Sequence, residues 1–273
     1  MTALQSPLFR LVRFLLFLLL LGAGSSSAHL VKKGDTLYSI ARANGVSVQR
    51  LMAVNGIKDP SRLQVGKRLT IPSASSSAST KKVGVKVAQS PSRASKALTI
   101  IIDPGHGGRD RGAVWGGVRE SDLNLKVAHK LNWYLKRAGY RTVMTRTSDR
   151  YVSLSTRAAI ANRYRNALFV SIHFNATRET WVRGGETFYA SSGRGSYLAS
   201  SIQRYLVSKC SVRNRGARFR GFSVLRNTHC PAVLVECGFI SNASERARCK
   251  SNSFQDAAAQ AILAGIQRYD RRY

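Results

Sequence analysis

Acidic residues are scarce in this sequence. Among 273 residues there are 13 Asp and Glu against 44 Lys and Arg, so the formal net charge at pH 7 is +31. A surplus of this size usually indicates nucleic acid as a partner, because Lys and Arg neutralise phosphates. The basic residues are, however, spread along the whole chain, which favours a polyanionic surrounding over one docking patch. Hydrophobic residues make up 44% of the chain, enough to bury a core.

The sequence also lacks an apolar run long enough to cross a membrane. Its apolar stretch Phe14–Leu21 is shorter than the roughly 20 residues that a transmembrane helix needs. Arg10 and Arg13 precede this stretch and small residues follow it up to Ala28, which is the pattern of a secretory signal peptide. We therefore predict a signal peptide over residues 1–28, export to the periplasm or cell wall, and no integral membrane segment after cleavage. Export makes nucleic acid an improbable partner and leaves the anionic polymers of a cell envelope.

Cysteine is scarce as well. Its four copies are Cys210, Cys230, Cys237 and Cys249, and no C-x-x-C pair is present, which argues against a zinc ribbon or a thioredoxin-like motif. Export permits disulfide bonds, whereas the apolar surroundings of Cys210 and Cys237 favour buried thiols. Both alternatives stay open at this point.

The first folded unit is expected over residues 29–72, with two short strands flanking two helices in the order βααβ. Helix caps and a turn are indicated by small polar residues and glycine between apolar stretches. The strands are expected at residues 29–32 and 69–71, and the caps and the turn at Asp35 or Thr36, Ser47 and Asn55-Gly56.

Residues 29–72 resemble the LysM module along their whole length, through the motifs GDTL, SIAR, LMAVNGI and LQVGKRLTIP. LysM modules bind glycans that contain N-acetylglucosamine, so the resemblance implies peptidoglycan as the partner. It also implies that these residues line the glycan groove: Gly34, Asp35, Thr36, Asn55, Gly56 and Ile57. Roles as caps and turn residues are also expected for them, and do not exclude backbone contacts to a sugar.

Strand and helix patterns alternate through the rest of the chain. Residues 73–97, rich in Ser, Ala and Lys, predict a flexible basic linker, and residues 98–273 predict an α/β domain with three layers around a mixed sheet. Strands are expected at residues 98–102, 140–145, 167–174, 185–190 and 232–236, and helices at 121–139 (capped by Ser121), 154–166, 196–208, 244–250 and 254–269.

Four side chains able to perform chemistry follow or lie within apolar segments of this domain. His106 lies on the glycine-rich turn of IIIDPGHGGRD, His173 lies in the strand FVSIHFNA, and Glu236 ends the strand AVLVE. Glu120 precedes the expected helix cap. In open α/β sheets, ligands collect beyond the carboxyl ends of the strands. Two histidines and a carboxylate from separate elements, with one further glutamate, are the donor set of a catalytic zinc site.

Residues 98–266 resemble the zinc-dependent N-acetylmuramoyl-L-alanine amidases. The matching motifs run in order: IIIDPGHGGRDRGAV, RESDLNL, VMTRTSDRYVSLSTRAAIAN, FVSIHFNA, RGGETFYA, RNRGAR and FSVLRNTHCPAVLVECGFISN. The resemblance implies a peptidoglycan hydrolase that cleaves the amide between N-acetylmuramic acid and L-alanine. It also implies that His106, Glu120 and His173 bind zinc and that Glu236 is the catalytic base.

Two other functions stay open: a zinc carboxypeptidase acting within the stem peptide, and a wall-binding protein without activity. Asn175 and Arg226 are expected to bind substrate or to stabilise loops, and Arg157 to form a structural ion pair. Asp103 and Asp110 are expected to cap the turn or to orient His106. No metal role is expected for the other histidines, and the protein is expected to be a monomer.

Overall fold

The structure is a computed structural model that describes residues 27–32, 35, 37–46, 48–57, 63–72 and 96–273. The predicted signal peptide up to Ser26 and nearly all of the predicted linker lie outside these residues. The chain divides into two compact units, which contain the described residues up to 72 and those from 96 onward. Within the described residues, no helix is long and apolar enough to span a membrane.

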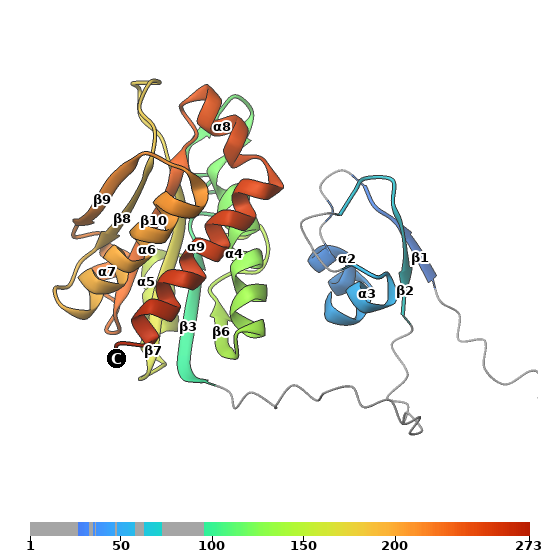
Figure 1. Ribbon diagram of the computed structural model, residues 1–273, viewed down its shortest axis with the longest axis horizontal. Coiled ribbons are helices and arrows are strands. Elements are labelled where there is room, and N and C mark those ends of the chain that lie inside the picture. The colour runs from blue at the N-terminus through green and yellow to red at the C-terminus, as the bar shows by residue number, and fades with distance from the viewer. Residues whose placement is uncertain (1–26, 33–34, 36, 47, 58–62, 73–95) are drawn as a thin grey trace, which may run out of the picture. The chain divides into compact units, whose positions relative to one another are not determined.

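The smaller unit has the predicted βααβ order (Figure 1). Its elements are β1 (Ser27–Leu30), α2 (Leu37–Ala43), α3 (Val48–Val54) and β2 (Arg68–Ile71). The two strands pair antiparallel, and a small core forms around the buried side chains of Leu37, Ile40, Leu51 and Leu69. The first strand lies two residues earlier than predicted, so the predicted cleavage after Ala28 falls inside it.

The larger unit is built on a mixed six-stranded sheet with the order β6-β3-β7-β10-β8-β9. The first four strands in this order are parallel, β8 is antiparallel to β10, and β9 is parallel to β8. The strands are β3 (Lys96–Pro104), β6 (Tyr140–Met144), β7 (Ala167–Asn175), β8 (Gly185–Tyr189), β9 (Asn214–Phe219) and β10 (Ala232–Phe239). The central strands β3, β7 and β10 are long apolar segments because both of their faces are covered.

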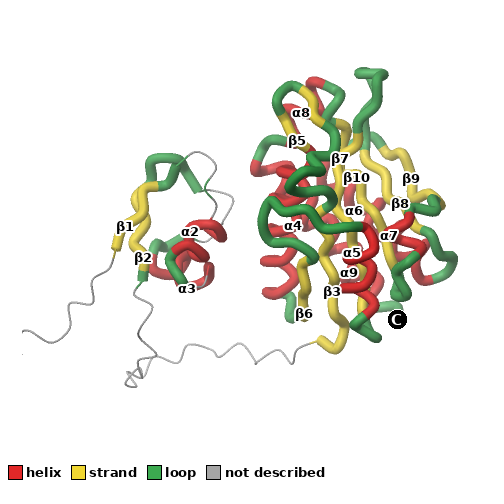
Figure 2. The backbone as a smooth tube through the Cα atoms, turned by 180° about the vertical axis from the view of Figure 1, so that it is seen from behind, coloured by secondary structure: helices red, strands yellow, loops and turns green. Residues whose placement is uncertain are grey.

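Helices cover both faces of this sheet, as Figures 1 and 2 show from opposite sides. One face carries α4 (Glu120–Arg137), α6 (Arg194–Cys210) and α9 (Asn252–Asp270), whose apolar residues recur at helical spacing. The other face carries α5 (Leu154–Asn162) and the short α7 (Ser223–Arg226) over a smaller apolar cluster. The remaining elements are α8 (Ala243–Cys249) and the hairpin of β4 (Val114–Trp115) and β5 (Val118–Arg119).

The predicted start of α4 is wrong by one residue. Helix α4 begins at Glu120, so Ser121 lies inside the helix and does not cap it. The reason is that β5 runs directly into the helix, and the guanidinium of Arg119 donates to Asp122 at 2.9 Å across the first turn. Helix α5 also ends earlier than expected, at Asn162, while β9 and the β4–β5 hairpin were not predicted.

The four cysteines are free thiols, so the structure favours the buried-thiol alternative. Three of them, Cys210, Cys237 and Cys249, are fully buried, and Cys230 is half-buried. Burial raises the pKa of Cys210 to about 12 and that of Cys230 to about 11, so both stay protonated near neutral pH.

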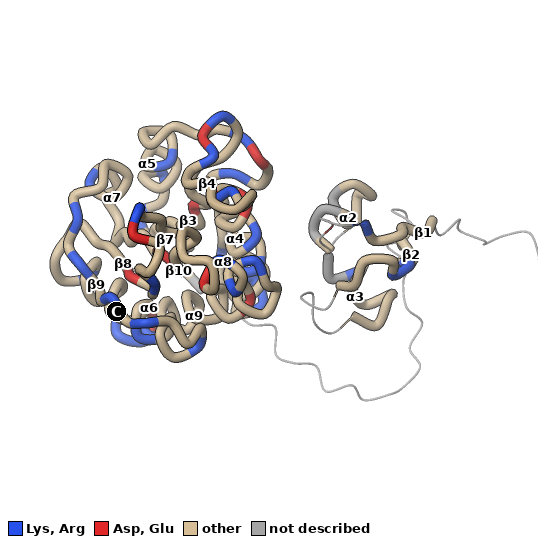
Figure 3. Tube along the Cα trace, turned by 90° about the horizontal axis from the view of Figure 1, so that it is seen from above, with Lys and Arg blue, Asp and Glu red and all other residues tan. Residues whose placement is uncertain are grey.

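Basic residues greatly outnumber acidic ones in the larger unit. Figure 3 shows Lys and Arg on many of its elements, whereas Asp and Glu are few. Several of these few acids are buried: Asp103, Glu120, Glu186 and Glu245. A buried acid needs hydrogen bonds or a partner charge, and each of these acids receives hydrogen bonds.

Candidate metal centre and active site

The turn after β3 is shaped to present His106. Its backbone has φ 59°, the left-handed region that a residue other than glycine seldom adopts, and the carbonyl of His106 accepts a hydrogen bond from Arg157 at 2.8 Å. Such a conformation costs about 1–3 kcal/mol and persists when surrounding contacts hold it. The glycines that follow, Gly107 and Gly108, also have positive φ. The turn at the end of the strand therefore has a fixed shape.

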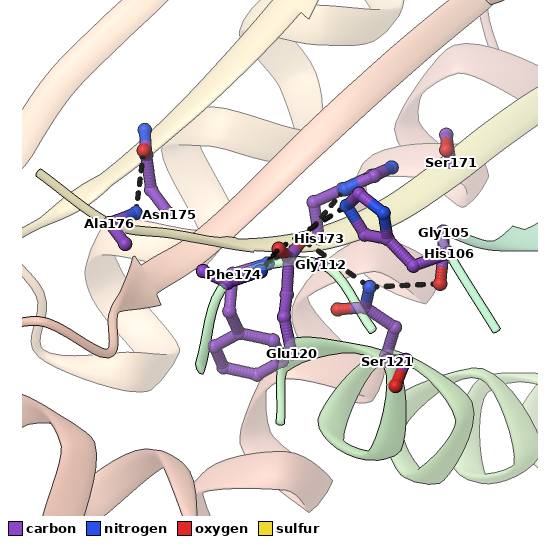
Figure 4. A network of polar contacts seen from close by, with 12 residues as sticks. Gly105, His106, Gly112, Glu120, Ser121, Ser171, His173, Phe174, Asn175 and Ala176 are labelled. Carbon is purple, nitrogen blue, oxygen red and sulfur yellow. Dashed lines mark hydrogen bonds and ion pairs between the residues drawn. The ribbon is translucent and has the colours of Figure 1, made fainter. Parts of the chain in front are cut away.

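His106, Glu120 and His173 converge from three separate elements. The Nε2 atom of His106 lies 3.2 Å from Oε2 of Glu120, and Nδ1 of His173 lies 2.8 Å from Oε1 of the same carboxylate. One candidate ligand atom from each residue lies within 4.8 Å of the other two. Figure 4 shows the two imidazoles next to each other, with the carboxylate of Glu120 directed toward them. The sequence-predicted ligands thus meet at one point.

Neighbouring groups hold each member of this cluster in place. Asp110 lies 2.8 Å from Nδ1 of His106, which orients that ring as expected. The backbone N–H of Ala113 donates to Oε2 of Glu120 at 2.9 Å, and that of Phe174 donates to Oε1 at 3.3 Å. Both carboxylate oxygens are therefore anchored, and the carboxylate is aimed before any ligand arrives.

Two glycines make the close packing of the cluster possible. A Cβ at Gly105 would lie 2.2 Å from the ring of His173, and a Cβ at Gly112 would lie 2.5 Å from Oε2 of Glu120. Any other residue at Gly105 would have to displace the histidine. Gly105 is required by the close approach alone, whereas Gly112 also has a positive φ, of 63°.

The charges in the cluster support one another. Burial alone would raise the pKa of Glu120, but the hydrogen bonds and charges of His106 and His173 outweigh it, and the pKa falls well below its usual range. Burial likewise acts to lower the pKa of His106, and the hydrogen bonds and charges of Glu120 and Asp110 outweigh it and raise that pKa. Glu120 is therefore ionised at neutral pH, which is the state that a metal ligand needs.

This donor set fits a metal ion such as zinc. Bonds of about 2.0–2.2 Å at a tetrahedral angle place neighbouring ligand atoms about 3.4 Å apart. One candidate ligand atom from each of the three residues lies within 4.8 Å of the other two, so small shifts of the side chains would bring them to this separation. Three protein ligands of nitrogen and oxygen type match a catalytic site, in which a further position remains for water.

Glu236 lies beside this cluster on the next strand. It is the register partner of His173 on β7 and of Glu186 on β8, so the three side chains project from the same face of the sheet. Its Oε2 atom is buried, and within the described part of the chain it has no hydrogen-bond partner. Burial, together with the charges of Glu120 and Glu186, raises the pKa of Glu236 well above its ordinary value. An unpaired carboxylate oxygen with a raised pKa is typical of a proton-transfer group.

A buried ionic network behind the site was only partly predicted. Arg157 lies 2.7 Å from Asp103, as the ion pair expected for it requires, and Asp103 also accepts from Thr145 and Ser171. Arg146 was not predicted: it is fully buried and donates to the carbonyls of Pro104, Gly105 and Ser121. Burial and the charge of Arg157 lower its pKa to about 10, so it stays cationic at neutral pH. This network fixes the turn that carries His106.

Asn175 and Arg226, the expected substrate-binding residues, lie in different surroundings. Asn175 is at the end of β7, and its amide nitrogen donates to Oε1 of Glu186 at 2.9 Å. Arg226 is exposed at the end of α7. The structure does not bring Arg226 into the His–Glu–His cluster. His229 is exposed and lies outside that cluster too.

Within the LysM unit, two of the predicted glycan-binding residues have structural contacts. Asp35 lies 2.7 Å from Nε2 of His29 and accepts from the backbone of Lys32. Asn55 exchanges two hydrogen bonds with the backbone of Thr70 on β2, both at 2.8 Å. Gly56 has φ 62° and is exposed, and Ile57 is half-buried. The predictions for Gly34, Thr36 and the cap Ser47 concern positions outside the described residues.

The fold and the site together define a class of protein: an α/β domain with a candidate metal centre of two histidines and one glutamate, preceded by a small βααβ unit. The sequence profile of the N-acetylmuramoyl-L-alanine amidase family (Amidase_3) matches residues 100–268, and the chain belongs to this family. The profile of the LysM domain matches residues 29–72. The family and the fold class expected from the sequence are therefore confirmed.

Known proteins similar to this chain include amidases from several bacteria. The N-acetylmuramoyl-L-alanine amidase LytC of Bacillus subtilis (strain 168) is 36% identical over 231 residues, which are 82% of this chain and 46% of LytC. The crystal structure of an N-acetylmuramoyl-L-alanine amidase from Clostridium difficile 630 is 38% identical with a TM-score of 0.62, covering 64% of this chain and 97% of that one. AmiC2 of Nostoc punctiforme is 36% identical with a TM-score of 0.62, covering 65% and 99%. The chain thus spans about half the length of LytC and nearly all of the solved domains.

Proposed function

We propose that this protein is an exported zinc amidase that cleaves the bond between N-acetylmuramic acid and the L-alanine of the peptidoglycan stem. The observation that carries the proposal is the convergence of His106, Glu120 and His173 beside the unpaired, buried carboxylate oxygen of Glu236. Membership of the N-acetylmuramoyl-L-alanine amidase family supports this choice of bond.

In the proposed mechanism, His106, Glu120 and His173 would hold the zinc ion, and Glu236 transfers protons. When bound, zinc would act as a Lewis acid that polarises the carbonyl and lowers the pKa of a bound water to about 7. Glu236 accepts a proton from the water as its oxygen attacks the lactyl carbonyl carbon. It then gives that proton to the leaving nitrogen, the carbon–nitrogen bond breaks, and the products are a muramoyl carboxylic acid and a peptide with a free L-alanine amine.

The protein's own surroundings favour this role for Glu236. A base with a pKa near the working pH transfers protons in both directions, and the environment of Glu236 raises its pKa from the ordinary value of a glutamate. The anchored carboxylate of Glu120 and the oriented ring of His106 keep the ligand atoms in position while the proton moves.

The LysM unit is proposed to hold the enzyme on its polymeric substrate. Its predicted contact residues are Gly34, Asp35, Thr36, Asn55, Gly56 and Ile57. The net charge of +31 adds electrostatic retention, because peptidoglycan stems carry carboxylates. A signal peptide over residues 1–28 would deliver the protein to the periplasm or cell wall, where this substrate occurs.

The proposal is tested by dye release from purified sacculi. The zinc-loaded protein should release dye, chelation should stop release, and added zinc should restore it. Glu236→Gln should keep zinc and fold but lose about 10²–10⁴-fold in rate, because only the proton acceptor is removed. Glu179→Gln, a change at an exposed glutamate, is the matched control and should leave the rate unchanged. Near-normal release by zinc-loaded Glu236→Gln would contradict the role of Glu236.

A further inference from the structure

Two arginines lie beside Glu186, on the side of it away from Glu236. Arg215 and Arg218 belong to β9, the edge strand next to β8. The Nε atom of Arg215 lies 3.6 Å from Oε2 of Glu186, and a terminal nitrogen of Arg218 lies 3.9 Å from the same oxygen. These separations are too long for hydrogen bonds, so neither arginine forms the paired contact that a guanidinium can make with a carboxylate.

The guanidinium groups of this pair are only partly engaged, since that of Arg215 lies over the ring of Phe239, 5.0 Å from its centroid, and neither group has a hydrogen bond to Glu186. Nε of Arg215 is buried and has no hydrogen-bond partner within the described part of the chain. Arg218 donates its Nε to the carbonyl of Arg215, and its side chain is 47% exposed. The terminal nitrogens of both groups form no hydrogen bond within the described residues, and these are the donors that can face a ligand. An unpaired buried donor is uncommon in folded proteins and calls for a partner.

Glu186 sets the position of both guanidinium groups without satisfying them. It is buried, its Oε1 accepts from the amide of Asn175 at 2.9 Å, and its Oε2 faces the arginines. One carboxylate shared between two arginines leaves the group with a positive charge. The interaction of Asn175 with Glu186 makes Asn175 a positioning residue for this pair.

The pair lies within reach of the proposed site of bond cleavage. Going across the sheet at one level, His173 is followed by Glu236 on the next strand and Glu186 on the one after it, with β9 beyond. Neighbouring strands lie about 4.7–4.9 Å apart, so the backbone of β9 lies about 10 Å from that of β10, which carries Glu236. An extended peptide covers about 3.3–3.6 Å per residue, so the second or third residue downstream of the cleaved amide would reach them.

We propose that Arg215 and Arg218 bind a free carboxylate on the second or third residue of the stem peptide and so make the enzyme selective for acidic stems. This inference rests on the proposed amidase function. The two halves of the substrate differ in charge. The N-acetylated sugars are neutral and the lactyl carboxyl is part of the amide, whereas the stem peptide carries free carboxylates. Arginine is also suited to the task, because its planar fork matches a carboxylate.

The test compares two soluble muramoyl peptides that differ only in whether the stem carboxylates on the second and third residues are free or converted to carboxamides. The wild-type enzyme should cleave the acidic form with a kcat/KM about tenfold higher or more, mainly through KM, because a charge-assisted hydrogen bond is lost with the carboxamide. Arg218→Gln and Arg215→Gln should each lose most of this preference while cleaving the carboxamide within about twofold of wild type. Arg218→Lys should keep part of it, since it retains the charge without the fork.

Arg204→Gln is the matched control. Arg204 is exposed on α6, which covers the opposite face of the sheet. The substitution therefore removes the same charge at a place away from the proposed subsite. It should leave the preference unchanged. A wild-type enzyme that cleaves both forms equally, or an Arg218→Gln variant that keeps the full preference, would overturn the inference. A wild-type enzyme that cleaves neither form would instead count against the amidase function. If Arg215→Gln fails to fold, the exposed Arg218 variants still decide the question.

Discussion

Glu236 carries a buried oxygen that receives no hydrogen bond from the described residues, and its surroundings raise its pKa. This has a consequence for stability. Between the ordinary carboxyl pKa and the raised one, the folded state binds more protons than the unfolded state, so stability falls as pH rises through that window. Above the ordinary carboxyl pKa, the buried carboxyl of Glu236 therefore destabilises the metal-free fold relative to lower pH.

Replacing this carboxyl should reveal the effect. In chelator-treated protein, Glu236→Gln should be more stable than wild type near pH 7, because the amide of glutamine does not ionise; each unit by which the fold raises the pKa of Glu236 corresponds to up to about 1.4 kcal/mol. The difference should shrink as pH falls to about 4.3 and below, where the carboxyl becomes protonated in the unfolded state as well. Thermal melting across pH 4–8 measures it, with Glu179→Gln as the exposed control. A difference that stays constant across this range would show that Glu236 is not held in an unfavourable charged state.

At the level of single residues, the candidate metal ligands and the catalytic glutamate could be predicted from the sequence, whereas the buried residues that position them could not. His106, Glu120, His173 and Glu236 were named from their positions after strands and from a family resemblance, and the structure brings them together. Arg146 and Glu186 were not named. Arginine and glutamate are common on surfaces, and only the packing of distant segments shows that these two are buried.

At the level of elements, the close approach of the turn after β3 to β7 makes Gly105 critical. A Cβ there would lie 2.2 Å from the imidazole of His173, and this glycine does not need a positive φ, so the obstacle is steric alone. Gly105→Ala should displace His173, weaken zinc binding by about tenfold or more and lower activity with it.

Metal affinity by competition with a chelator, measured beside thermal melting, checks this. Gly221→Ala is the matched control, because a Cβ there would meet only Arg226 at an ordinary 3.4 Å and no positive φ is required. Unchanged zinc affinity in a folded Gly105→Ala protein would show that His173 is not needed in its observed position.

The elements themselves were predictable where the local pattern is strong. The apolar runs of β3, β7 and β10 and the helical spacing of α4 and α9 were recognised, although the first residue of α4 was not. Strand β9 was missed because its sequence, NRGARF, contains a glycine and two arginines and little apolar character. It forms at the sheet edge, where pairing with β8 stabilises an extended conformation that the local sequence alone does not favour.

At the level of the whole molecule, the chain has two separate compact units, and the proposed function places wall binding in the smaller one and bond cleavage in the larger one. Deleting residues 29–72 should therefore weaken retention on sacculi by about tenfold or more while changing the hydrolysis of a small soluble muramoyl peptide by less than about twofold. Pelleting with sacculi and a soluble-substrate assay measure the two effects. Equal losses in both would show that the LysM unit contributes to the active site. Retention should also fall with added salt, because part of it is electrostatic.

The identity of the bond that is cut is the most direct test of the proposed amidase function. Mass spectrometry of the products from purified peptidoglycan digested by the zinc-loaded protein identifies it. An amidase should yield free stem peptides that begin with an L-alanine amine, together with glycan chains that have lost their stems. Stems that remain attached to the sugar but have lost a terminal D-alanine would contradict it, and would assign the His106–Glu120–His173 centre to a carboxypeptidase instead.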